Sequence, residues 1–148
     1  MRSVHTKEMA EFNRLYKETD NIYTRYAAFQ GISTTTLCVL YSLYISETPC
    51  TQTQLVEDWG IPMQTINSCL KAMEKGGTVR MEFAEGNRKS KCILLTSRGI
   101  EMAEQIIAPL VEAENHAMDA LEAEEQRLLM EVTRKHAQLL QNFLFAER

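Results

Sequence analysis

Several side chains suited to reading DNA bases lie close together in the middle of the chain. They are the residues Gln64, Thr65, Asn67, Ser68 and Lys71. Glutamine and asparagine can make paired hydrogen bonds to adenine, hydroxyls can bond any base or a phosphate, and lysine attracts phosphate. On one face of a helix this set predicts direct contact with base edges. The alternative is the polar face of an ordinary surface helix.

Basic side chains follow directly after this set. Between residues 63 and 98 there are seven basic and three acidic residues, a net charge of +4, although the whole chain carries −4. Arg88, Lys89 and Lys91 are close together in this stretch. Because a duplex responds to charge within a Debye length of about 8 Å, the acidity of residues 100–148 does not exclude DNA binding. The alternative is a solvated hairpin with ordinary surface charges.

The residues around this set predict two short helices joined by a tight turn. Thr51 to Gln54 has the pattern of a capping box, which opens a helix through Trp59. Gly60 breaks that helix, and Pro62 is expected to take the first position of the next one. The second helix is expected to end at the glycine pair 76–77.

A β-hairpin is predicted after the second helix. Val79, Met81 and Phe83 alternate with charged residues, as in a half-buried strand. A turn at 85–88 leads to a return strand over 91–95. Helix, turn, helix and hairpin form a winged helix-turn-helix, in which the second helix lies against a duplex and the hairpin reaches the backbone or minor groove.

Three long amphipathic helices flank this core. They are expected over 4–30, from Thr96 or Ser97 onward with a kink near Pro109, and over 123–145. Their apolar stripes are too long for a small core to cover, which favours a homodimer with interleaved terminal helices. The alternative is a monomer that folds these helices onto its own core.

The predicted fold is therefore mainly α with a small β-hairpin wing. Residues 1–148 are expected to form a single domain, with a winged helix-turn-helix core at 33–99. Residues 1–32 and 100–148 would supply the dimerisation helices.

This order of elements resembles the MarR family of bacterial transcription regulators. The resemblance covers nearly the whole chain and is most specific in three segments: STTTLCVLYSLY at 33–44, TQLVEDWGIPMQTINSCLKAMEKGGTV at 53–79, and NRKSKCILLTSRG at 87–99. It implies a homodimer that represses transcription by occupying a palindromic operator. It also implies release of DNA on binding a small aromatic or apolar effector, or on thiol oxidation.

Two departures from the family pattern affect the expected contacts. The wing usually reads Asp-x-Arg, whereas this chain has Asn87, Arg88 and Lys89, so Arg88 becomes the candidate for the minor groove. Ser68 stands where an arginine is frequent. The resulting set favours an A·T-leaning site of modest affinity.

Further candidate residues lie outside the second helix of the motif, which we call the reading helix. Thr53 and Ser33, at helix starts, are expected to contact phosphate. An effector pocket is expected where the dimerisation helices meet the winged helix-turn-helix core. Its expected lining is Tyr16, Tyr23, Tyr26 and Trp59, although a residue of each of these types is also common in a hydrophobic core.

Other classes of function find little support. No phosphate loop, HExxH motif or GxSxG elbow is present, so we expect no catalytic residues, no cofactor and no metal site. The start of the chain lacks a signal peptide, and no apolar run could span a membrane, which indicates a cytoplasmic protein. Two alternatives stay open: a winged-helix protein-interaction module that has lost DNA readout, and a redox-responsive regulator using one of four scattered cysteines.

Overall fold

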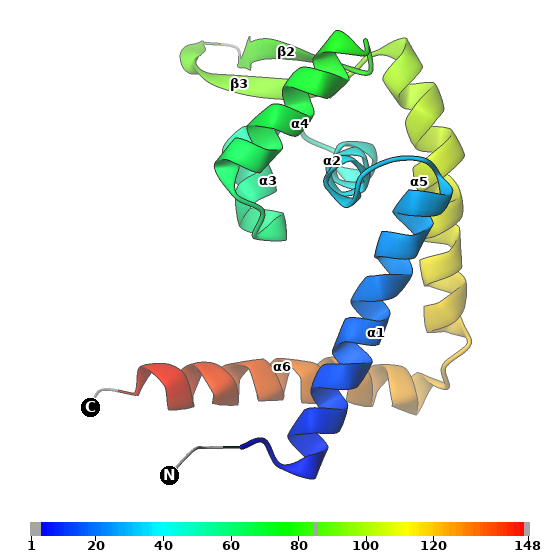
Figure 1. Ribbon diagram of the computed structural model, residues 1–148, viewed down its shortest axis with the longest axis vertical. Helices are drawn as coiled ribbons and strands as arrows, with labels where there is room; N and C mark the ends of the chain where they lie inside the picture. Colours follow the sequence, from blue (N-terminus) through cyan, green and yellow to red (C-terminus); the bar gives the residue numbers. More distant parts are fainter. Residues whose placement is uncertain (1–3, 85, 147–148) are drawn as a thin grey trace. The chain divides into compact units, whose positions relative to one another are not determined.

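The described residues form six helices and three strands in the computed structural model (Figure 1). The structure describes residues 4–84 and 86–146, and for residues 84 and 87–90 it describes the backbone only. In chain order the elements are α1 (Lys7–Phe29), α2 (Thr34–Ile45), β1 (Cys50–Thr51), α3 (Gln52–Trp59), α4 (Met63–Lys75), β2 (Val79–Ala84), β3 (Asn87–Leu95), α5 (Ser97–Asp119) and α6 (Ala123–Phe145). The chain divides into two compact units, residues 1–108 and 109–148, with the boundary inside α5.

Hydroxyl side chains begin four of the helices, including α5, where Thr96 Oγ1 accepts the backbone N–H of Gly99 at 3.1 Å. Thr6 Oγ1 accepts the backbone N–H of Met9 at 3.1 Å, and Ser33 Oγ accepts that of Thr36 at 3.0 Å. Thr51 Oγ1 accepts the backbone N–H of Gln54 at 3.2 Å, as the capping pattern predicted. Each bond satisfies one of the donors that a first helical turn leaves without a partner in the helix.

The turn between α3 and α4 differs slightly from the sequence prediction. Gly60 ends α3 in the left-handed conformation, with φ of 62°. Pro62 is the residue before α4, not its first residue, and its carbonyl accepts the N–H groups of Thr65 and Ile66. The ring still suits this place, because it has no N–H to leave unpaired and its φ is already restricted.

A small antiparallel sheet in the order β1–β3–β2 carries the hairpin. Val79 pairs with Leu95 at its base, and the register shifts between Phe83 and Ala84. The sequence prediction was wrong on two details. The return strand begins at Asn87, not at residue 91, and the two-residue strand β1 was missed, in which Cys50 pairs with Ile93.

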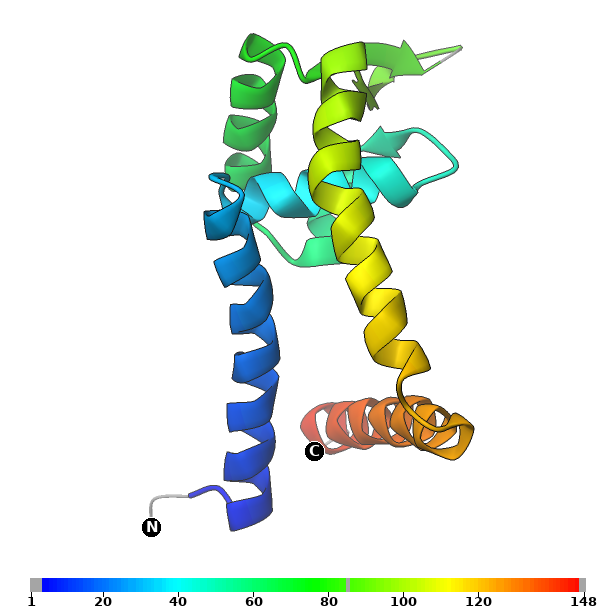
Figure 2. The ribbon, with the colours of Figure 1, turned by 90° about the vertical axis from the view of Figure 1, so that its right-hand side faces the viewer.

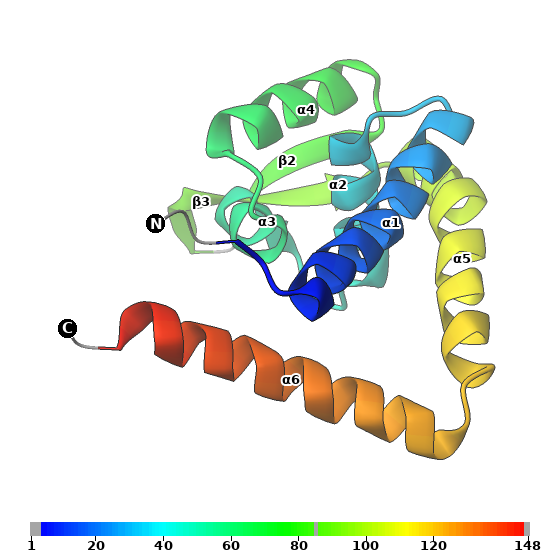
Figure 3. The same cartoon turned by 60° about the horizontal axis from the view of Figure 1, so that its bottom comes forward.

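The core of the first unit lies among α2, α3, α4 and the base of the hairpin, which pack against one another (Figures 1 and 3). Its fully buried large side chains come from every one of these elements and from α5: Val39, Leu40, Leu55, Ile66, Leu70, Val79, Ile93 and Ile107. Burying a side chain of this size contributes roughly 1.5–3 kcal/mol. The two short helices are therefore held mainly by packing and not by their own length.

Helix α1 leads away from this core as one long rod (Figure 2). It packs against α2, and its only buried residue is Ala27, near its C-terminal end. The apolar stripe predicted for this helix is largely exposed in the single chain, at Phe12, Leu15, Tyr16, Ile22 and Phe29.

The second unit contains the end of α5 and all of α6. Pro109 lies inside α5, which continues through it to Asp119. Helix α6 has the predicted bounds and opens with a capping box, in which the Glu125 carboxylate accepts the backbone N–H of Glu122 at 2.8 Å. No residue of α6 is buried. Among the described residues, no helix is both long and apolar enough to cross a membrane.

Candidate nucleic-acid interface

Helix α4 separates its apolar and polar residues into two faces. Ile66, Leu70 and Met73, spaced by three or four residues, are buried against the core. Four residues of the predicted base-reading set are exposed, namely Gln64, Thr65, Ser68 and Lys71, whereas Asn67 is half-buried. Because the buried residues hold the helix by one side, the exposed set is presented together along the other. The structure thus brings this part of the predicted site onto one helix.

The two predicted phosphate contacts lie near helix starts. Thr53 is exposed in the first turn of α3. Ser33 is exposed at the start of α2, where its hydroxyl is 2.9 Å from Thr36 Oγ1 in addition to accepting the Thr36 N–H. Both therefore stand where the positive end of a helix dipole favours an anion.

The hairpin carries two arrangements that the sequence did not predict. Arg80 forms an ion pair with Glu82 on the same strand, which reduces the positive charge that this strand offers. The ammonium of Lys91 lies 5.5 Å from the centre of the Phe83 ring, whose side chain is 58% exposed. Val79 is therefore buried, as the alternating pattern predicted, whereas Phe83 near the other end of β2 is exposed. The side chains of Arg88 and Lys89 lie outside the described residues, although both belong to β3.

The four aromatic residues expected to line an effector pocket have separate surroundings. Tyr26 donates a hydrogen bond of 2.7 Å to the carbonyl of Ile106, which joins α1 to α5. Tyr16 is exposed and stacks on Phe12, and Tyr23 is half-buried on the same helix. Trp59 meets Tyr41 edge to face, with ring centres 5.9 Å apart.

Trp59 also has a clear structural role, which yields a stability prediction. Its indole Nε1 donates a hydrogen bond of 2.7 Å to the buried hydroxyl of Ser42, tying the end of α3 to α2. Replacing Trp59 by phenylalanine is expected to lower the free energy of unfolding by about 1 kcal/mol, because the indole donor is lost. Urea unfolding would measure it. In a double-mutant cycle with Ser42→Ala the two losses should be less than additive, and strict additivity would contradict a direct bond.

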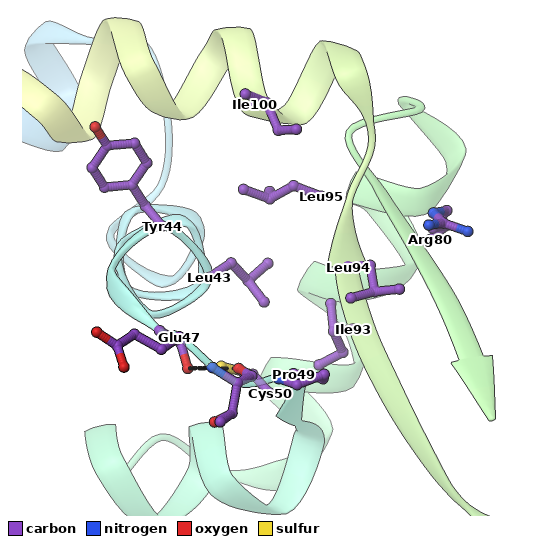
Figure 4. Close-up of a pocket in the computed structure, with 12 residues that line it drawn as sticks. Leu43, Tyr44, Glu47, Pro49, Cys50, Arg80, Ile93, Leu94, Leu95 and Ile100 are labelled. Carbon is purple, nitrogen blue, oxygen red and sulfur yellow. Dashed lines mark hydrogen bonds between the residues drawn. The ribbon is translucent and has the colours of Figure 1, made fainter. Parts of the chain in front are cut away.

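A cleft of about 470 Å³ opens on the first unit beside the base of the hairpin (Figure 4). Leu43 and Tyr44 of α2 face Leu95 of β3 and Ile100 of α5 across it, and the loop before β1 closes one end. Its volume is in the range of small-molecule sites. None of the four predicted aromatic residues lines this cleft. Since its walls come from three distant segments, no local sequence pattern marked it.

The cysteines are free thiols, of which Cys50 is buried and the other three are half-buried. Burial raises the pKa of the Cys38 thiol to about 11. Cys69 Sγ lies 3.5 Å from Thr36 Oγ1 and 3.7 Å from Met73 Sδ, in the contact between α2 and α4. Since the thiolate is the reactive form, the raised pKa disfavours Cys38 as a sensor. Among the described residues, no group of three or more His, Cys, Asp or Glu could hold a metal ion.

Comparison with solved structures identifies this arrangement. A MarR family regulator from Neisseria meningitidis superimposes with a TM-score of 0.79 and 18% identity, covering 94% of this chain and 97% of that one. The transcription regulator MarR from Oenococcus oeni gives a TM-score of 0.69 and 17% identity, over 86% of this chain and 98% of that one. The chain has the MarR-family fold.

A third MarR-type structure is a MarR family transcriptional regulator from Streptomyces coelicolor, solved in complex with DNA. It has a TM-score of 0.69 and 26% identity, and covers 93% of this chain and 94% of that one. The sequence matches no family model and no curated protein. All three of these proteins are transcription regulators. In this MarR-type fold α3 and α4 are the helix-turn-helix, and β2 and β3 form the wing.

Proposed function

We propose that this chain is a homodimeric, sequence-specific DNA-binding transcription regulator, most simply a repressor, that acts in the bacterial cytoplasm. The observation that carries the proposal is the division of α4, whose apolar side is buried while Gln64, Thr65, Ser68 and Lys71 are exposed. These side chains combine donors and acceptors for base edges with a charge for phosphate. The DNA complex of the similar Streptomyces protein supports the same role.

Dimerisation is proposed from the apolar residues that a single chain leaves uncovered. Helix α6 exposes Leu128, Leu129, Val132, Leu139, Leu140, Phe143 and Leu144, and α1 exposes Phe12, Leu15, Tyr16 and Ile22. Contiguous exposed apolar surface of this kind is typical of an interface. A twofold dimer would carry two copies of α4, which suits a palindromic operator with half-sites about one helical turn apart.

We also propose that a small aromatic or apolar effector modulates operator binding. The cleft beside α2 supports this part of the proposal, because aliphatic side chains such as Leu43, Leu95 and Ile100 line much of it. Leu95 is the last residue of the wing strand β3, and Ile100 lies in the helix that follows it. A ligand between these residues and α2 would therefore bias the position of the wing.

Selection of bound duplexes from a random DNA library at moderate salt tests the proposal. Recovery of a palindrome with half-sites about 10 base pairs apart is the expected result. Recovery of no motif, with binding that disappears as salt rises, would overturn sequence-specific regulation and leave the protein-interaction module as the better hypothesis.

Two substitutions separate base reading from charge attraction on the selected site. Asn67→Ala is expected to change preference at one base position by roughly 1–3 kcal/mol, because an amide that bonds adenine is removed. Arg88→Ala should weaken binding to all duplexes and lower the salt slope by about 1. Binding to a panel of single-base variants at several salt concentrations measures both. Asn115→Ala, at an exposed amide on α5, is the control and should change neither quantity.

A further inference from the structure

One hydroxyl joins the reading helix to the start of α5. Thr96 Oγ1 donates a hydrogen bond of 2.6 Å to the carbonyl of Gly77, which follows α4, and accepts the backbone N–H of Gly99 at 3.1 Å. The Thr96 N–H also donates to the carbonyl of Thr78 at 3.1 Å. A hydroxyl can donate and accept at once, so this single side chain caps α5 and binds the segment after α4.

On the α4 side of this connection, Thr78 makes hydrogen bonds of similar length. The buried Thr78 hydroxyl and the Thr78 N–H both donate to the carbonyl of Met73 in the last turn of α4, at 3.0 and 2.9 Å. A Cβ placed on Gly99 would lie 1.9 Å from the Thr78 carbonyl oxygen, so the first turn of α5 directly contacts that carbonyl. At the same point Val79, the first residue of β2, pairs with Leu95, the last residue of β3, at the base of the wing. We refer to Thr78, Thr96 and Gly99 as the joint.

We infer that Thr96 is a positioning residue that sets the orientation of α4 and the wing relative to α5. The inference rests on the proposed function, because it assigns the joint the task of holding two DNA-contacting elements in one register. When the reading helix and the wing are attached to one rigid element, they lose little conformational entropy on contacting bases and phosphates. A looser attachment weakens the contacts that need exact placement first, which are the specific ones. Non-specific attraction depends on charge alone and is insensitive to such loosening.

The test compares Thr96→Val with Thr96→Ser. Valine keeps the shape and removes the hydroxyl, whereas serine keeps the hydroxyl. At a temperature where circular dichroism shows both variants folded, Thr96→Val is expected to lower the ratio of specific to non-specific affinity about tenfold, the effect of losing one base contact. Thr96→Ser should restore the ratio. Thr6→Val, which removes the equivalent cap from α1, is the matched control and should leave the ratio unchanged.

A second readout does not depend on DNA. Amide hydrogen exchange at Thr78, Val79 and Gly99 should be faster in Thr96→Val, unchanged in Thr6→Val and restored in Thr96→Ser. Unchanged exchange at these amides would overturn the inference whether or not the protein reads DNA. Failure of the parent to prefer any duplex, with faster exchange in Thr96→Val, would instead overturn the proposed function and retain the joint as the element that orients α4. Equal loss of discrimination in Thr6→Val and Thr96→Val would reduce the role of Thr96 to general stability and refute positioning.

Discussion

Replacing Gly99 by alanine is expected to destabilise the protein by about 3 kcal/mol, at the upper end of the usual cost of an added methyl group in a packed site. The added Cβ would stand 1.9 Å from the Thr78 carbonyl oxygen and 3.1 Å from a methyl carbon of Leu95. The first obstacle is backbone, so it cannot rotate aside. The first turn of α5 must move away from Thr78, which weakens the bonds that Thr96 makes to the segment after α4. Urea unfolding at a fixed protein concentration measures the loss.

Gly76 provides a matched control in the same region. Its φ is −74°, and a Cβ there would make an ordinary contact of 3.4 Å with the carbonyl of Ala72. Gly76→Ala should therefore be neutral or stabilising, by about 0.5 kcal/mol, because alanine restricts the unfolded chain. If the two variants had the same stability, the close approach at Gly99 would not exist as described.

Local sequence signals predicted the elements whose boundaries depend on local chemistry. The apolar period and the acidic first turn placed α6 at Ala123–Phe145, and Gly60 and Thr51 delimited α3. The missed strand β1 consists of two residues, which is too short to show any alternation, and it exists because Cys50 and Thr51 pair with distant residues of β3. The early start of β3 likewise depends on pairing with β2 and not on residue preference.

The candidate site also has one part that local sequence signals predicted and another that depends on distant contacts. The polar face of α4 was predictable because the helical period alone separates Ile66, Leu70 and Met73 from their neighbours. The joint and the cleft were not, since the joint brings the segment after α4 to the start of α5, and the cleft brings α2 to β3 and α5. Trp59 shows the limit of residue type as a guide. Its place in an effector pocket stays a prediction, whereas its hydrogen bond to Ser42 could not be predicted because Ser42 lies on a different helix.

Replacing Leu139 by glutamate is expected to cost operator affinity roughly 10²- to 10⁴-fold, the range that linking two binding modules contributes. Leu139 belongs to the apolar stripe of α6 and is 44% exposed in the single chain, so the substitution leaves the monomer core intact. In the proposed dimer it would place a charge in an apolar interface without a partner, which is strongly unfavourable. Sedimentation and DNA titration at matched concentrations would show a monomer that binds only half-sites.

Gln141→Glu adds the same charge to the same helix on the opposite side, about 150° away from the centre of the stripe at 100° per residue. It should therefore remain dimeric and keep its affinity, which controls for the effect of added negative charge on DNA binding. If Leu139→Glu also stayed dimeric with unchanged affinity, α6 could not be the interface, and the exposed stripe of α1 would be the remaining candidate. A folded monomer in both variants would show that charge anywhere on α6 disrupts assembly and that the stripe itself has no special role.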